Sequence, residues 1–336
     1  MSESGGSNIS ALVTGASGFI GRHLVRTLLR RNRHVLALCR RPDSLLDLKD
    51  PLLRIIPGDL EDPRSYLPHL SKEVVVFHLA AIRARLGSTA DHYRQVNEMA
   101  SLKLAQAAAA ARVQKFVYVS TAVVFGPSST IPINGANGPR EPAMEYCYAR
   151  SRVSSLREMN KLVGSGLPLV TLCPTIVFGP DHPAHPNRIT AQIRRLLHSG
   201  IDVVIGGGHQ RRNLVFVEDV IRGILLAETR EGFGEVFILG GEEISHRDFN
   251  ALVFALAGRK SRMRLSVPAG IGLRGAKWLD WFLDHDQGTG FESTVNVLMS
   301  EWQYSSQKAI GILGYEWTPI RNGLLTTLHH IQGEVH

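Results

Sequence analysis

The sequence predicts an α/β fold, a doubly wound parallel sheet followed by a smaller C-terminal lobe. Short apolar runs alternate with stretches that are apolar at helical spacing through the first half of the chain. Strands that are apolar on both faces are typical of a parallel sheet covered by helices on both sides. The expected strands cover residues 9–13, 35–39, 53–56, 74–79, 116–120 and 168–173. A long helix expected at 93–112 ends in an alanine-rich run that favours helix.

The turn after the first expected strand holds three glycines, Gly15, Gly18 and Gly21, and a helical pattern follows it at 23–29. Glycine lets the backbone approach phosphate oxygens, and a helix N-terminus offers free N–H groups and a positive dipole end. Between a strand and a helix, this spacing is typical of a turn that holds a dinucleotide pyrophosphate. The sequence therefore predicts a Rossmann-type domain near its N-terminus.

After residue 179 the pattern changes to a proline-rich loop, a helix at 189–198 and a short strand at 202–205. Further strands are expected at 215–217 and 236–239, around a helix that starts near Asp219. The chain is thus divided into a disordered tail, a dinucleotide-binding domain and a lobe that closes over the carboxyl ends of the strands. The tail covers 1–8, the dinucleotide-binding domain covers 9–180 and 214–240, and the lobe covers 181–213 and 241–332.

Composition and charge favour a soluble protein that binds small anions. The chain is 44% hydrophobic and 20% charged, and its net charge of +8 is spread along the sequence. This distribution favours anionic small ligands over nucleic acid. No apolar run approaches the roughly 20 residues of a membrane span, so stable membrane insertion is not expected. The stretch 276–283, with two tryptophans, is expected to be lobe core or the wall of an apolar substrate site, with a membrane-surface role as the alternative.

The cysteines and histidines predict neither a disulfide nor a metal site. Cys39, Cys147 and Cys173 are an odd, scattered set, which is typical of reduced thiols in a cytoplasmic protein. His182 and His185 stand in a proline-rich loop without carboxylate partners, so no metal is predicted there.

The residues after the second expected strand indicate which nicotinamide cofactor is preferred. Proteins that bind NAD usually have an acidic residue here, which accepts hydrogen bonds from the ribose 2′-hydroxyl. This chain has Arg40 and Arg41 instead, and its first carboxylate is Asp43. Because a guanidinium suits a 2′-phosphate, the sequence predicts NADP(H), with NAD(H) as the alternative.

Five segments together resemble the extended short-chain dehydrogenases/reductases. They are the glycine turn at 14–21, Gly-Asp-Leu at 58–60, His-Leu-Ala-Ala at 78–81, Val-Asn at 96–97, and Val-Tyr-Val-Ser-Thr-Ala-Val-Val-Phe-Gly at 117–126. The family includes nucleotide-sugar epimerases, dehydratases, and reductases similar to dihydroflavonol reductase and 3β-hydroxysteroid dehydrogenase. With the two arginines, the resemblance implies a cofactor site made of Gly15, Ser17, Gly18, Phe19, Ile20, Gly21, Arg40, Arg41, Asp59, Leu60, Leu79, Ala80, Ala81, Asn97, Tyr148, Arg152 and Pro174.

The resemblance also implies a catalytic site. The family's catalytic Ser or Thr falls on Thr121, and its Tyr-x-x-x-Lys helix corresponds to Tyr148 and Arg152, with Tyr146 and Arg150 as a competing register. A phenol has a pKa of about 10, so a nearby cation is needed to favour the phenolate when Tyr148 acts as a base. Thr121 is expected to orient the substrate oxygen.

In either register, arginine replaces the family's lysine. Arginine supplies a cation and hydrogen bonds for ribose hydroxyls, but it cannot pass a proton onward. Two hypotheses follow. Arg152 performs the electrostatic part of the lysine's task in an active enzyme, or the protein binds NADP, catalyses little and serves a regulatory role.

The expected substrate residues are Ser120, Ile176 and Arg212. Ile176 stands where sugar-nucleotide enzymes of the family have an asparagine that contacts the diphosphate, so it disfavours a nucleotide sugar. Arg212 stands where epimerases have an arginine that grips this diphosphate, and a surface arginine before a strand is the alternative. We therefore expect an NADP(H)-dependent oxidoreductase that acts on a carbonyl or secondary alcohol. A nucleotide-sugar epimerase or dehydratase is the alternative, and the resemblance suggests a homodimer through helices 93–112 and 148–163.

Overall fold

The computed structural model describes residues 10–83, 88–128, 132–135, 138–140, 146–183, 185–230, 232–282 and 291–333. The tail expected at 1–8 and the side chains of the stretch 276–283 lie outside the part that the structure describes.

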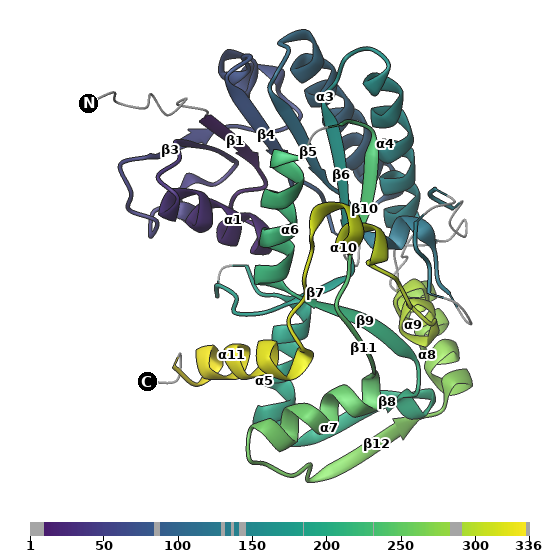
Figure 1. Ribbon diagram of the computed structural model, residues 1–336. Helices are drawn as coiled ribbons and strands as arrows, with labels where there is room; N and C mark the ends of the chain where they lie inside the picture. The colour runs from purple at the N-terminus through teal and green to yellow at the C-terminus, as the bar shows by residue number, and fades with distance from the viewer. Residues whose placement is uncertain are drawn as a thin grey trace.

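The central sheet has seven parallel strands in the order β10-β6-β5-β4-β1-β2-β3 (Figure 1). They are β1 (Ser10–Thr14), β2 (Val35–Cys39), β3 (Leu53–Pro57), β4 (Val74–His78), β5 (Lys115–Val119), β6 (Leu169–Pro174) and β10 (Glu235–Leu239). Each expected strand of the first half is present within a residue or two of its expected bounds, and the one expected at 236–239 forms an edge of the same sheet.

Helices cover both faces of this sheet, which confirms the doubly wound fold (Figure 1). One apolar cluster joins the sheet to α1 (Phe19–Arg30), α6 (Val217–Thr229) and α10 (Gln307–Leu313). A second cluster joins the opposite face to α3 (Ser101–Ala110) and α4 (Cys147–Val163). The helix expected at 93–112 begins earlier, with α2 (Ala90–Tyr93), and passes through a π-helical segment (Arg94–Ala100) into α3.

The smaller lobe has two small sheets and its own apolar core. The first sheet has the order β11 (Glu242–Ser245), β9 (Arg211–Phe216), β7 (Ile176–Phe178), and the second pairs β8 (Ile201–Ile205) with β12 (Met263–Val267). The helices here are α5 (Arg188–Ser199), α7 (His246–Leu256), α8 (Ala269–Phe282), α9 (Phe291–Met299) and α11 (Ile320–Gly333). Short 3-10 turns lie at Pro42–Leu45, Pro63–Ser65, Leu67–His69, Ala122–Phe125 and Gly206–Gly208.

The strand expected at 215–217 was placed too late. β9 begins at Arg211, and Val217 is already the first residue of α6. The reason is that β9 pairs with β7 and β11 in a sheet of the lobe, which the local sequence does not reveal.

The parallel sheet brings the segments of the expected site to one edge. Carboxyl ends of parallel strands share an edge, and ligands bind where the strand order reverses. Here the chain continues from β1 through β2 to β3 on one side and returns to β4 and β5 on the other. The turns after β1 and β4 are therefore neighbours. No helix in the described ranges is long and apolar enough to cross a bilayer.

Candidate active site

The glycine turn after β1 is shaped by close backbone contacts. Gly15 has a φ of +69°, and a Cβ atom there would lie 2.7 Å from the backbone nitrogen of Ala80. A Cβ on Gly21 would lie 2.1 Å from the carbonyl oxygen of Gly15. Both positions therefore require glycine.

Gly18 precedes α1, and no side chain caps this helix end. The first turn of α1 also lacks an acidic residue. An uncapped helix N-terminus free of carboxylates suits an anion. Ser17, Phe19 and Ile20, which complete the turn, are partly exposed. The observed turn thus fits the pyrophosphate that the sequence predicts.

The end of β4 is fastened to this turn by a buried polar contact. Thr14 Oγ1 lies 2.7 Å from His78 Nδ1 and accepts a hydrogen bond from the Ala80 N–H at 3.2 Å. Burial lowers the pKa of His78 to about 3, so its ring is neutral. Leu79 and Ala81 flank the contact and are partly exposed. Thr14 and His78 therefore fix the spacing between the turns after β1 and β4.

The other expected cofactor residues lie near the same edge but differ in their contacts. The Asp59 carboxylate accepts a hydrogen bond from the Glu61 N–H at 3.0 Å, and the Leu60 side chain is buried. Asn97 is fully buried and bonds the backbone of Ile82 in both directions, at 2.7 and 3.0 Å.

Asn97 also donates to Ser151 Oγ at 3.1 Å, which connects the segment after β4 to α4. Its amide groups are thus used within the protein, which indicates a positioning role. Pro174 is the last residue of β6 and is buried.

Arg40 and Arg41 follow β2, which lies next to β1, and both are exposed. Neither forms an ion pair with a carboxylate in the described ranges. The backbone carbonyl of Arg41 accepts hydrogen bonds from Ser44 Oγ at 2.6 Å and Cys39 Sγ at 3.0 Å, which shape the turn. Two unpaired guanidinium groups are therefore available beside the glycine turn.

Tyr148 and Thr121 face one another across the end of β5. Thr121 follows that strand directly, and Tyr148 lies in the first turn of α4. Burial raises the pKa of Tyr148, whereas the nearby Arg152 cation and the neighbouring Thr121 hydroxyl lower it. The phenol thus has a hydroxyl beside it and a cation one helical turn away.

The two tyrosine registers differ in structure. Tyr148 and Arg152 lie on the same face of α4, and Arg152 is 2% exposed. Tyr146 precedes the helix as its N-cap, and Arg150 is exposed. Only the pair Tyr148 and Arg152 therefore places a buried cation next to a phenol, because residues four apart share a helix face.

Arg152 is deeply buried against β5. Its Nη2 donates to the Val119 carbonyl at 2.7 Å, and its guanidinium carbon lies 5.0 Å from the centre of the Tyr118 ring. Its Nε and Nη1 atoms have no hydrogen-bond partner among the described residues. Orphaned donors on a buried cation are costly, so these atoms suit acceptors supplied by a bound ligand. The two nitrogens without partners are the reason that the site fits the ribose hydroxyls of a nicotinamide cofactor.

Ser120 is 8% exposed, and its Oγ also lacks a hydrogen-bond partner in the described part of the chain. It lies beside the Cys173 thiol, whose pKa burial raises to about 12. Cys173 is therefore a neutral thiol and not a nucleophile.

The two remaining substrate residues lie in the three-stranded sheet of the lobe. Ile176 starts β7 and is partly buried. Arg212 lies inside β9, is 5% exposed, and has no partner for Nε and Nη2 in the described ranges. Burial lowers the pKa of Arg212 to about 10. The surface arginine before a strand, considered as an alternative, is thus wrong.

Comparison with known proteins identifies the family. The model of the NAD dependent epimerase/dehydratase family matches residues 11–240. The chain belongs to this family. The curated relatives of this chain include a ketoreductase, a steroid dehydrogenase, an epimerase and a dehydratase, which are the kinds of enzyme that the resemblance implied.

Two relatives and one solved structure show the range of the family. A 4-hydroxy-2-methyl-3-oxo-4-farnesyl-3,4-dihydroquinoline-1-oxide ketoreductase of Stigmatella aurantiaca is 28% identical over 254 residues, 75% of this chain and 74% of that protein. A 3 beta-hydroxysteroid dehydrogenase/Delta 5-->4-isomerase of Mycobacterium tuberculosis is 29% identical over 272 residues, 77% and 72% of the two chains. A UDP-glucuronic acid 4-epimerase of Bacillus cereus, in complex with UDP-glucuronic acid and NAD, is 23% identical with a TM-score of 0.75, covering 97% and 99%. This last likeness concerns the fold.

Sequence reasoning about the family site missed Tyr118. This residue stacks on His78, with ring centres 5.5 Å apart, and contacts Arg152 on its ring. Its hydroxyl donates to Ser155 Oγ at 2.9 Å. In the sequence, Tyr118 belongs to an apolar strand, and only the pairing of β4 with β5 places His78 beside it.

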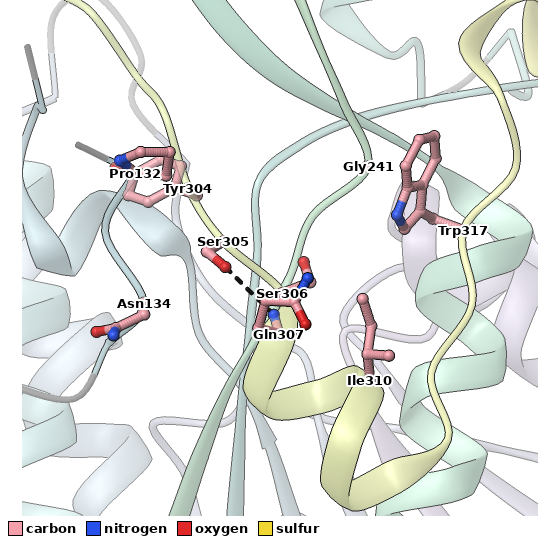
Figure 2. A pocket seen from close by; sticks show the side chains of 9 residues that line it. All are labelled: Pro132, Asn134, Gly241, Tyr304, Ser305, Ser306, Gln307, Ile310 and Trp317. Carbon is pink, nitrogen blue, oxygen red and sulfur yellow. Dashed lines mark hydrogen bonds between the residues drawn. The ribbon is translucent and has the colours of Figure 1, made fainter. Parts of the chain in front are cut away.

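A separate cavity of about 440 Å³ lies around the start of α10 (Figure 2). Tyr304, Ser306 and Trp317 are among its lining residues, and none of the expected site residues lines it. The Tyr304 hydroxyl donates to the Gly126 carbonyl at 2.9 Å. None of its described lining residues is charged, and the cavity is distinct from the expected active site.

Proposed function

We propose that this protein is an NADP(H)-dependent reductase that converts a carbonyl to a secondary alcohol, with Tyr148 as the general acid. The observation that carries the proposal is the placement of Tyr148 beside Thr121, with buried Arg152 one helical turn away. The ketoreductase and steroid dehydrogenase named above are relatives with this kind of chemistry.

The chain's own residues account for proton transfer. The glycine turn would hold the cofactor pyrophosphate, and a bound NADPH would supply the hydride for the carbonyl carbon. The Thr121 hydroxyl holds the substrate oxygen, and Tyr148 O–H donates its proton to that oxygen as negative charge develops there. Arg152 stabilises the phenolate left behind, because an opposite charge nearby favours the ionised form.

The pKa of Tyr148 favours reduction over oxidation. Burial raises this pKa from its ordinary value of 10, so the phenol is protonated at neutral pH. A general acid must hold its proton before the reaction, whereas a general base must have lost it. Reduction therefore starts from the protonation state that the protein provides.

Two arginines that have no carboxylate partner among the described residues favour NADP(H). Arg40 and Arg41 are exposed at the end of β2, adjacent to the strand that leads into the glycine turn. A guanidinium binds phosphate oxygens through paired charge-assisted hydrogen bonds, which suits a 2′-phosphate.

The test is NADPH oxidation with a panel of ketones, for the parent and for Tyr148→Phe. The substitution removes the proton donor and keeps the ring, so turnover should fall by about 100-fold or more while the protein still binds NADPH. Tyr146→Phe is the matched control, because it removes a neighbouring phenol outside the helix. Equal loss in both variants, or none in Tyr148→Phe, would contradict the assignment. Tight NADPH binding without turnover on any ketone would instead support the regulatory alternative.

Arg212 favours a second candidate, epimerisation or dehydration of a nucleotide sugar. A buried guanidinium with two orphaned nitrogens suits a diphosphate. In this case turnover would leave NADPH absorbance unchanged, and Arg212→Met would weaken binding of a UDP-sugar without affecting NADPH. Loss of both affinities would show that Arg212 is structural.

A further inference from the structure

The two-stranded sheet of the lobe has one packed face and one open face. On the packed face, Asp202 accepts hydrogen bonds from Asn250 Nδ2 at 2.6 Å and Arg264 Nε at 2.7 Å. Val204, on the same face, is 1% exposed. On this face β8 therefore points into the lobe, whereas Arg264 and Ser266 of the edge strand β12 are exposed.

The open face is apolar. β8 and β12 are parallel, and their register pairs Ile201 with Met263 and Val203 with Leu265. Paired residues point to the same side of a sheet, so these four side chains share one face. Met263 is 48% exposed, and Val203 and Leu265 are each 42% exposed.

Helix α8 extends this apolar surface without covering it. A Cβ on Gly272 of α8 would lie 3.5 Å from Ile205, so the helix contacts the carboxyl end of the sheet. One residue earlier, Ile271 is 63% exposed, the highest value among the exposed large hydrophobic residues of the described chain. Val203, Met263, Leu265 and Ile271 are therefore exposed on the two-stranded sheet and on the helix that contacts its carboxyl end. Figure 1 shows β12 at the outer edge of the lobe.

Positive charge surrounds the same surface. Residues 257–277 include six Lys or Arg and no Asp or Glu. Arg259, Lys260, Arg262 and Arg274 are exposed, and none of the four has a carboxylate partner in the described ranges. Arg274 is three residues from Ile271 on α8, so a cation lies beside the most exposed aliphatic side chain.

We propose that this surface, formed by Val203, Met263, Leu265 and Ile271 with the surrounding basic residues, docks on an anionic lipid bilayer. Aliphatic side chains that enter the headgroup region, surrounded by cations that attract acidic lipids, are the two features of interfacial binding. A nucleic acid would match the charge but not the row of aliphatic residues, and aromatic residues for base stacking are absent from the four. The docking is peripheral, since no described helix could span the bilayer.

Vesicle sedimentation tests the proposal. The full chain should bind vesicles of phosphatidylcholine mixed with phosphatidylserine, and added salt should weaken binding because the charges are exposed. The double variant Lys260→Glu with Arg274→Glu should lower the partition coefficient by about 25-fold, from roughly fivefold for each lost cation. Met263→Ser with Leu265→Ser should also weaken binding, at unchanged charge.

The control is Lys49→Glu with Lys72→Glu, which makes the same charge change on exposed residues near β3 and β4. It should bind vesicles like the parent, and thermal melting should show that all variants are folded. Equal binding to phosphatidylcholine alone, or equal losses in the control and test variants, would overturn the proposal. A third result would also overturn it: the parent does not bind vesicles, light scattering shows that it is a dimer, and Met263→Ser with Leu265→Ser makes it a monomer. This face would then join two copies of the chain.

Discussion

Replacing Arg152 with methionine tests the electrostatic role proposed for it. The guanidinium is buried and lies four residues from Tyr148 on α4, so it lowers the pKa of that phenol with little screening by salt. Side chains at this spacing are neighbours on the helix, and two unit charges about 6 Å apart attract one another by roughly 2.8 kcal/mol at an effective dielectric constant of about 20. Arg152→Met should therefore raise the pKa of Tyr148.

The sign of the effect differs between the two reaction directions. Alcohol oxidation needs the phenolate, so below the pKa its rate should fall by about 100-fold, the factor to which roughly 2.8 kcal/mol corresponds, and its pH profile should move to higher pH. Ketone reduction starts from the protonated phenol, so it should fall less. The assay is the pH dependence of NADP⁺ reduction and NADPH oxidation with one alcohol and ketone pair.

Arg152→Lys is the matched control. It keeps the charge, and an amine can pass a proton onward where a guanidinium cannot, so turnover should rise above that of the parent. Arg152→Met should remain folded, because it removes a buried cation that has no carboxylate partner in the described ranges. An oxidation profile for Arg152→Met that superimposes on the parent profile would refute the reasoning.

Two further predictions concern cofactor choice and stability. Arg40→Asp should weaken NADPH binding by about 10- to 100-fold in fluorescence titration, because a charge-assisted hydrogen bond contributes roughly 1.5–3 kcal/mol. NADH binding should not weaken. An unchanged NADPH affinity would contradict the assignment of Arg40 to the 2′-phosphate. His78 has a folded pKa of about 3 against an ordinary value of 6.5, so protons bind the unfolded chain first and stability falls as pH drops below 6.5. Between pH 6.5 and 5 the free energy of unfolding measured in urea should fall by about 2 kcal/mol, and His78→Gln should not show this loss. Equal pH dependence in both proteins would contradict the argument from burial of His78.

The fold could be predicted where strands are short, apolar and separated by helices, because that pattern is local. The small sheets of the lobe could not. β12 is exposed at four of its five residues, and β11 is only partly buried, so neither has a buried-strand pattern. The strand near Arg212 was expected only at 215–217, yet β9 begins at Arg211 through pairing with distant segments.

The sequence predicted which segments form the site, but not which of their side chains contact one another. The glycine turn depends on local geometry, and the close approach of Gly15 to Ala80 follows once β1 and β4 are neighbours. The contact of His78 with Thr14 and Tyr118 depends on strand order and register, which no single stretch of sequence contains. The sequence alone likewise shows that an arginine replaces the family's lysine, but not what this arginine contacts or how it affects Tyr148.

The structure gives that arginine a defined place. The Val119 carbonyl and the Tyr118 ring hold the guanidinium, and His78, which stacks on the same tyrosine, is neutral and adds no competing positive charge. Contacts with β5 thus accommodate the Arg152 side chain, which is longer than that of lysine. Two of its nitrogens, which have no partner among the described residues, remain for a ligand. Since this cation only partly offsets the burial of Tyr148, the phenol keeps its proton at neutral pH. The arginine is therefore compatible with a reductase, in which the tyrosine gives its proton away, and less suited to a reaction that begins by removing one.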